Sequence, residues 1–136
     1  MNVVDSSAWL EFFADGPNAG EFALPLADRA SLIVPTITIY EVFKAVCRQR
    51  GDDAALQATA LMQQGRAVEL SPSLAMIAAR MSLELALPMA DSIILATTRL
   101  HDATLWTQDE HFRNLPGVQY FSKVQPNFQP RKVRDP

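Results

Sequence analysis

The stretch PMADSIILATTRL, residues 88–100, has a helix pattern that is apolar from Met89 to Ala96 except at Asp91 and Ser92. A helix with so little polar surface packs into a core. Asp91 lies in its first turn. Because an ionised carboxylate that leaves water without a partner costs several kcal/mol, a core-facing Asp91 needs hydrogen-bond donors, a cation or a metal ion.

Short strands alternate with helices along the rest of the chain. The apolar patterns predict strands at 2–4, 32–34, 68–70, 104–106 and 118–121. They predict helices at 6–14, 19–29, 37–50, from 52 or 53 to 64, at 72–85 and from 88 to 101, and a short helical turn at 109–112. Asn18 and Ser71 are the expected N-caps of their helices, and Gly51 the expected left-handed C-cap. The alternation predicts an α/β fold with a parallel sheet covered on both faces.

Length and composition exclude several classes of protein. The 136 residues fit one domain, and no apolar run approaches the ~20 residues of a membrane span. No signal peptide is visible, so a cytoplasmic protein is expected. Cys47 is the only cysteine and is expected to be buried, and His101 and His111 are ten residues apart with no cysteine nearby, so a zinc site is not expected. The net charge of −3 argues against a general nucleic-acid binder without metal ions or a local basic patch.

The composition changes at residue 125. Three prolines and the basic residues Arg131, Lys132 and Arg134 follow, which predicts a basic, proline-containing tail over 125–136. The domain is accordingly expected at 1–124. The tail is interpreted as a solvated end, with contact to RNA as the alternative.

Four acids occupy similar positions relative to the predicted strands and helices. Asp5 follows the first strand, Glu41 lies early in the helix after the second strand, Asp91 is in a first helical turn, and Asp109 follows the strand that ends at Trp106. Sites in such folds form beyond the carboxyl ends of the strands. Acids gathered there would repel one another unless divalent cations bind, and oxygen ligands suit Mg²⁺ or Mn²⁺. Such ions activate water and stabilise charge on phosphate, which predicts phosphodiester hydrolysis.

Each acid also has a purely structural interpretation. Asp5 and Asp109 have the positions of helix N-caps, and Asp91 complements a helix dipole. Glu41 fits a capping box with Thr38 or an ion pair with Lys44, and residues 107–110 also match a capping box. The competing hypothesis is therefore a non-catalytic protein- or RNA-binding module whose acids cap helices.

The motifs resemble those of a known family. Val3–Trp9, the helix with Glu41, Ala90–Ala96 and Thr107–Phe112 resemble the PIN-domain ribonucleases, and within them the VapC toxins of toxin–antitoxin pairs. The resemblance runs from residue 1 to about 121. It implies a three-layer α/β/α domain with a parallel sheet, and Mg²⁺- or Mn²⁺-dependent endoribonuclease activity on RNA such as tRNA or rRNA. It also implies a homodimer and a cognate antitoxin that blocks the active site and itself binds DNA.

The resemblance assigns roles by position. Asp5, Glu41, Asp91 and Asp109 match the family's four acids. Asp5 and Asp91 would be the main metal ligands, Asp109 a ligand directly or through water, and Glu41 would orient water or help hold a metal. A related possibility keeps the metal and changes the substrate to DNA, as in flap-type nucleases, but the chain has no room for the clamps such enzymes carry.

Residues near the acids have smaller expected roles. Thr107 matches a hydroxyl that supports the site, and Ser6 matches a Ser/Thr beside the first acid, whereas Glu110 matches no family position. Arg48 and Arg50 end their helix, where they either complement the helix C-terminus or contact RNA phosphate. The aromatic residues of the first helix are expected in the core, with an antitoxin groove as the alternative; they are Trp9, Phe12 and Phe13.

Overall fold

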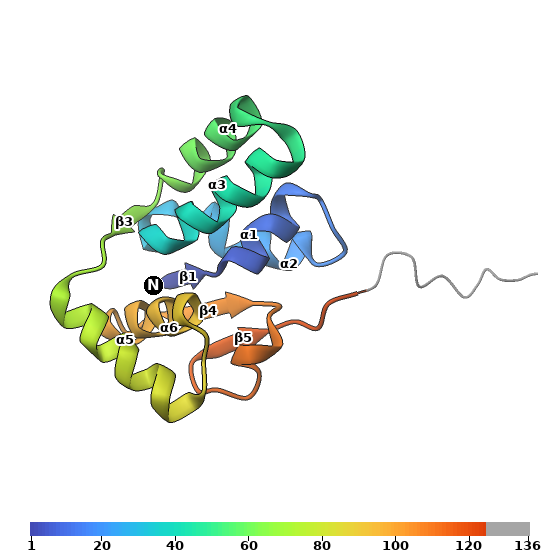
Figure 1. Ribbon diagram of the computed structural model, residues 1–136. Helices are drawn as coiled ribbons and strands as arrows, with labels where there is room; N and C mark the ends of the chain where they lie inside the picture. Colours follow the sequence, from blue (N-terminus) through green and yellow to red (C-terminus); the bar gives the residue numbers. More distant parts are fainter. Residues whose placement is uncertain (125–136) are drawn as a thin grey trace, which may run out of the picture.

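A parallel sheet of five short strands, in the order β3-β2-β1-β4-β5, forms the middle layer of the molecule (Figure 1). The computed structural model describes residues 1–124, so the predicted basic tail at 125–136 lies outside the described residues. The strands are β1 (Asn2–Val4), β2 (Leu32–Pro35), β3 (Arg66–Val68), β4 (Thr104–Thr107) and β5 (Val118–Tyr120). The predicted α/β fold with a parallel sheet is confirmed.

Helices connect the strands and cover both faces of the sheet (Figure 1). They are α1 (Ser6–Phe13), α2 (Ala19–Ala27), α3 (Thr36–Arg50), α4 (Asp52–Met62), α5 (Pro72–Leu85) and α6 (Met89–Leu100), with 3₁₀ turns η1 (Arg29–Ser31) and η2 (Glu110–Phe112). Within residues 1–124 no single helix is long and apolar enough to cross a membrane. The helices α5 and α6 have the required length and apolarity only when taken together, and they are bent by 114° relative to each other.

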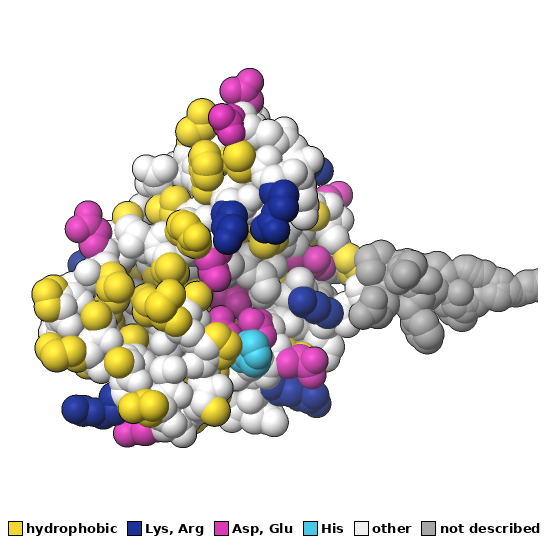
Figure 2. All heavy atoms as spheres, viewed as in Figure 1, with side chains coloured by type: hydrophobic (Ala, Val, Ile, Leu, Met, Phe, Trp, Pro, Cys, Tyr) yellow, Lys and Arg dark blue, Asp and Glu magenta, His cyan; other side chains and the backbone are white. Residues whose placement is uncertain are grey.

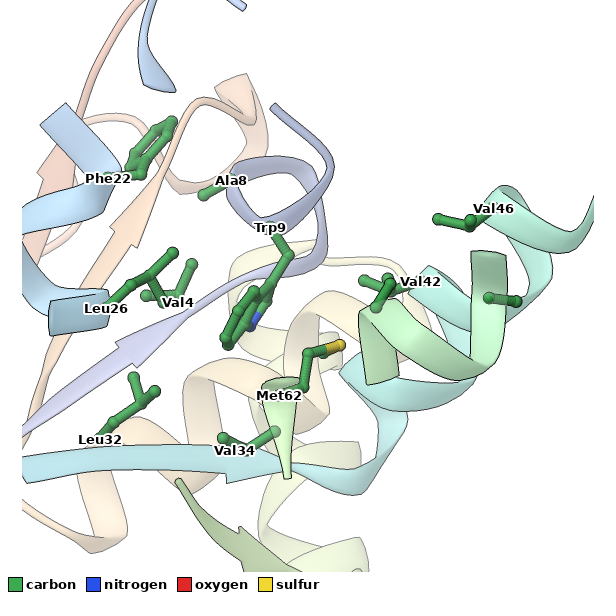
Figure 3. Close-up of a cluster of buried hydrophobic side chains, with 12 residues drawn as sticks. Val4, Ala8, Trp9, Phe22, Leu26, Leu32, Val34, Val42, Val46 and Met62 are labelled. Atoms are coloured by element: carbon green, nitrogen blue, oxygen red, sulfur yellow. The ribbon is translucent and has the colours of Figure 1, made fainter. Parts of the chain in front are cut away.

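Successive side chains along the strands point to opposite faces of the sheet, and this divides the core into two clusters. Val4 and Val34 point into the cluster built with α1–α4, whereas Val3 and Ile33 point into the opposite cluster with α6 and η2. Figure 3 shows Trp9 in the centre of the first cluster, between the strands and α3. Its side chain is only 2% exposed, so the core interpretation of Trp9 is correct. The two clusters give the three-layer α/β/α architecture.

Three local expectations differ from the structure. Gly51 is the C-cap of α3 with a positive φ of 90°, as expected, but its ψ of 178° is extended rather than left-handed helical, because this one residue turns the chain from α3 directly into α4. Asn18 precedes α2 without capping it, since its side-chain amide donates to Gln108 Oε1 and to the Ser122 carbonyl. The third strand is Arg66–Val68 instead of 68–70, because α4 ends early and Gly65 brings the chain against Val34 at once.

The sheet has its topological switch point between β1 and β4. The chain moves from β1 to β2 and β3 on one side, then returns to place β4 on the other side of β1 and β5 beyond it. Ligand sites of open α/β sheets form at the carboxyl edge of such a point. α6 runs into β4, so its N-terminus, with Asp91, lies at the same edge that the ends of β1 and β4 reach.

Candidate active site

Asp5 is held at the end of β1 by three donors. Its Oδ1 accepts from Ser7 Oγ at 2.8 Å and from the Ala8 N–H at 3.1 Å, and its Oδ2 accepts from Thr107 Oγ1 at 2.9 Å. Asp5 is the N-cap of α1, as its structural interpretation predicted, and it is only 2% exposed. The cap therefore fixes a buried carboxylate at the switch point rather than a solvated one at the surface.

Thr107 links the first acid to the fourth. Its hydroxyl donates to Asp5 and accepts from the Asp109 N–H at 2.9 Å, and the residue is fully buried. One side chain at the end of β4 thus holds the carboxylate of Asp5 and the backbone N–H of Asp109 in position. The resemblance implies a supporting role for Thr107, and its hydroxyl lies between two of the four acids.

Glu41 of α3 contacts the first residue of α1. Ser6 Oγ donates to Glu41 Oε1 at 2.5 Å, a contact between α1 and α3. The predicted capping box is wrong: α3 begins at Thr36, its N-cap is Pro35, and Thr38 Oγ1 donates to the Pro35 carbonyl. In the described residues Glu41 has no ion pair with Lys44, whose Nζ lies 5.7 Å from the centre of the Tyr40 ring.

Asp91 and Asp109 meet at a histidine. His111 Nδ1 lies 2.7 Å from Asp91 Oδ2 and 3.2 Å from Asp109 Oδ1. Because an ionised carboxylate only accepts, Nδ1 carries the proton and donates to Asp91. Asp109 also caps η2 by accepting from the His111 N–H at 2.9 Å, as expected of a cap. Pro88, the N-cap of α6, makes no side-chain cap bond, and the carboxylate of Asp91 is bound to His111.

The four acids share one electrostatic field. Burial raises the pKa of Asp5 to about 7 against its three hydrogen bonds, and the charge of Asp109 adds to the rise. Burial, followed by the charge of Asp109 and finally that of Glu41, raises the pKa of Asp91, whereas His111 lowers it. The hydrogen bond to Asp91 is the main cause that raises the pKa of His111. Carboxyl groups whose pKa is raised by burial and by a neighbouring charge, as in Asp5 and Asp91, are characteristic of functional sites.

The donor set fits a divalent cation. Asp91, Asp109 and His111 each offer one ligand atom, and these atoms lie within 4.8 Å of one another. Carboxylate oxygens suit Mg²⁺ and Mn²⁺, and an imidazole nitrogen is better suited to the transition metal. Asp5 lies outside this set of three, and its carboxylate is occupied by three protein donors.

His111 is the site residue that sequence reasoning missed. It stands 20 residues from Asp91, and no sequence periodicity connects a 3₁₀ turn after β4 with the first turn of α6. Its position two residues after Asp109 was the available signal. Figure 2 shows the result on the surface: carboxylates gather around one histidine in the middle of this face, with Lys and Arg side chains on two sides.

Two cavities lie near the site: the larger has Ser7 and Gln108 in its lining, and the smaller has Asp109. A cavity of 590 Å³ lies among α1, α3 and α4 and has apolar walls at Leu10, Phe13 and Val46. A cavity of 430 Å³ lies beyond Asp109 and His111, toward β5. Gln108 and Lys123 line both cavities, so the two share a wall.

Comparison with known proteins identifies the fold. A sequence model of the PIN domain matches residues 3–118, which include all four acids. A toxin–antitoxin complex from Klebsiella pneumoniae contains a chain with 25% identity and a TM-score of 0.72, over 88% of this chain and 96% of that one.

Mycobacterium tuberculosis VapC20, described as a sarcin-ricin loop cleaving toxin, has 18% identity and a TM-score of 0.69, with 82% of this chain and 92% of that chain covered. VapBC2 from Rickettsia felis, bound to a promoter DNA fragment, has 12% identity and a TM-score of 0.67, with coverage of 89% and 97%. No match was found among curated proteins. With most of its length matched, this chain belongs to the PIN domain family.

Proposed function

We propose that this protein is a divalent-metal-dependent endoribonuclease and the toxin of a type II toxin–antitoxin pair. The observation that carries the proposal is the meeting of four acids at the switch point, with His111 bridging two of them. Helix capping accounts for Asp5 and Asp109 and the helix dipole for Asp91, but neither a cap nor an ion pair accounts for Glu41, which favours a nuclease over a non-catalytic module. Similarity to a chain of a toxin–antitoxin complex supports the toxin role.

Each residue of the site has a separate proposed role in the hydrolysis. Mg²⁺ or Mn²⁺ bound to Asp91 and Asp109, with Asp5 and His111 beside them, would acidify water and offset charge on the scissile phosphate. Asp5 keeps its orientation through three donors, and Glu41, fixed by Ser6, can accept a proton from water. In-line attack of water on phosphorus would leave a 5′-phosphate and a 3′-hydroxyl. The proposed substrates are structured cellular RNAs, such as tRNA or rRNA, in the cytoplasm.

A cleavage assay tests this proposal. Total RNA is incubated with the purified protein and Mg²⁺ or Mn²⁺, beside Asp91→Asn and the matched control Asp53→Asn. Asp53 is also a first-turn helix acid, in α4, but it is exposed and has no part in the site. We expect cleavage by wild type and Asp53→Asn and at least a hundredfold loss for Asp91→Asn. Equal RNA cleavage by wild type and both variants, or no cleavage of any RNA by wild type, would refute the proposal.

The proposed antitoxin site is the 590 Å³ cavity. Its apolar wall, with Leu10, Phe13 and Val46, matches the way a groove receives an amphipathic segment, and Arg50 stands at its border. A segment in this cavity would lie against Gln108, the residue before Asp109. Phe13→Glu should therefore abolish toxin neutralisation in co-expression while RNA cleavage by the free protein persists. Neutralisation of the variant as strong as that of wild type would refute this site.

A homodimer is proposed through the apolar surface of α5 and the start of α6. Met76, Leu83 and Met89 are 67%, 86% and 71% exposed there, and Figure 2 shows hydrophobic side chains crowded over this region. Exposed apolar patches of this kind mark interaction surfaces. Leu83→Glu should shift sedimentation from dimer to monomer, whereas Leu24→Glu, on the 66%-exposed Leu24 of α2, should not. A monomeric wild type would refute the dimer.

A further inference from the structure

The 430 Å³ cavity beside Asp109 and His111 has a lining that matches a nucleotide. Its walls include two cations, Arg113 and Lys123, and one aromatic ring, that of Tyr120. We propose that this cavity binds the nucleotide next to the scissile bond, with Arg113 and Lys123 on phosphate oxygens. This inference rests on the proposed endoribonuclease function, and it names the residues that hold the substrate strand on one side of the acids.

The fold places the cavity directly beside the reacting groups. Tyr120 of β5 is paired in register with Thr107 of β4, the residue that fixes Asp5 and Asp109. The Phe121 N–H donates to the Thr107 carbonyl at 2.9 Å. Asp109 and His111 themselves form one side of the cavity. Because Asp109 and His111 belong both to the acid cluster and to this cavity, an RNA strand that passes beyond them enters the cavity.

The segment that carries Arg113 is anchored on both sides. Phe112 is fully buried, and Leu115 packs against the same core cluster. The Arg113 guanidinium lies 5.8 Å from the centre of the Tyr120 ring, a cation–π arrangement that limits its freedom. A guanidinium fixed in this way loses less entropy when it binds phosphate, and it offers a planar set of donors.

The cavity lining carries charges of both signs. Asp109 and Glu110 are its acidic residues, and Arg113 and Lys123 are its basic residues. Within residues 1–124 neither cation forms an ion pair with a carboxylate. A chain with a net charge of −3 thus has two cations without a carboxylate partner beside its acid cluster. A lining with both signs suits a polyanion whose scissile phosphate lies at the metal-binding acids and whose neighbouring phosphate is bound by the two cations.

The lining favours RNA over an acidic protein segment. Single-stranded nucleic acid is bound by cations that follow the backbone together with rings or guanidinium planes that accept a base, and the cavity supplies both. Ser122 adds a hydroxyl able to hydrogen-bond a base edge or a ribose hydroxyl, whereas the Gln108 amide already binds Asn18 and Glu11. A volume of 430 Å³ is within the range of small-ligand pockets.

Binding of a short RNA tests the inference without requiring cleavage. The probe is a fluorescein-labelled RNA hexamer with phosphorothioate linkages, which resists hydrolysis, and its anisotropy is followed at several KCl concentrations in Mg²⁺. We expect Arg113→Gln and Lys123→Gln each to raise Kd about tenfold. Each should also reduce the slope of log Kd against log salt by about 0.7, the value for one phosphate contact on a single strand.

Matched controls separate this effect from general charge. Arg66→Gln removes an exposed cation from β3, the edge strand opposite β5, and should leave Kd within about twofold of wild type. Tyr120→Phe should bind as wild type because it keeps the ring, whereas Tyr120→Leu should weaken binding. Arg113→Lys should lie between wild type and Arg113→Gln, since it keeps charge without the planar donors.

The outcomes distinguish the two proposals. Wild type that does not bind the hexamer, or variants at Arg113 and Lys123 with the Kd and salt slope of Arg66→Gln, would overturn the inference even if unmodified RNA is cleaved. A hexaglutamate peptide that displaces RNA at equal concentration would overturn it in favour of an acidic protein segment. Binding as expected without cleavage of any RNA would refute the endoribonuclease and leave the nucleotide site standing.

Discussion

Asp5 carries the largest pKa shift in the site, and the shift makes the stability of the metal-free protein depend on pH. Burial raises the pKa of this carboxyl from 3.8 to about 7. Above about pH 4 the unfolded chain gives up the proton that the folded protein keeps until about pH 7. The contribution of Asp5 is therefore fully present below about pH 4 and is lost as pH rises through about 7.

The size of the loss follows from the shift. About three pKa units at 1.36 kcal/mol each correspond to about 4 kcal/mol, to be regarded as an upper figure because buried sites relax and admit water. Asp5→Asn is neutral at every pH and its carbonyl oxygen can still accept from Ser7 and Ala8. The variant should match wild type near pH 4 and become more stable by up to about 4 kcal/mol near pH 8.

Urea denaturation in EDTA, at a series of pH values between those limits, measures the difference. The raised pKa values of Asp91 and His111 change the stability of wild type in the same direction, so only the difference between wild type and Asp5→Asn isolates Asp5. Asp53→Asn, at an exposed helix start, should follow wild type throughout. Parallel curves for wild type and Asp5→Asn would show that Asp5 is not destabilised by burial and would refute the reasoning.

Three further predictions concern the metal, the Glu41 contact and the core. Mg²⁺ at a hundred times Kd should stabilise wild type by about 3 kcal/mol in thermal melts and Asp91→Asn far less; equal shifts would contradict a metal at Asp91. Ser6→Ala frees Glu41 and should lower kcat about tenfold with a stability change of about 1 kcal/mol; unchanged kcat would remove Glu41 from the chemistry. Met62→Ala leaves a cavity beneath α4 and should cost about 2–5 kcal/mol by urea denaturation; a loss under 1 kcal/mol would mean that the site collapses.

The pattern of elements was readable from the sequence because it is local. Apolar spacing and the breaks at Pro35, Pro72 and Pro88 fixed the helices and strands to within a few residues, and β3 was misplaced because its three exposed or half-buried residues carry almost no apolar signal. The position of each acid just after a strand or in an early helical turn was likewise readable. Parallel topology then brings such positions to one edge of the sheet.

Side-chain partners were decided only by tertiary structure. Thr107 and Asp5 are 102 residues apart, Ser6 and Glu41 are 35 apart, and His111 and Asp91 are 20 apart. The docking of α6 and η2 onto the sheet brings the last pair together, and burial among packed elements raises the pKa of Asp5. The sequence by itself determined which groups reach the edge of the sheet, since periodicity and chain breaks act over a few residues. Only the packed structure decided which group bonds which, because hydrogen-bond geometry and loss of water depend on neighbours distant along the chain.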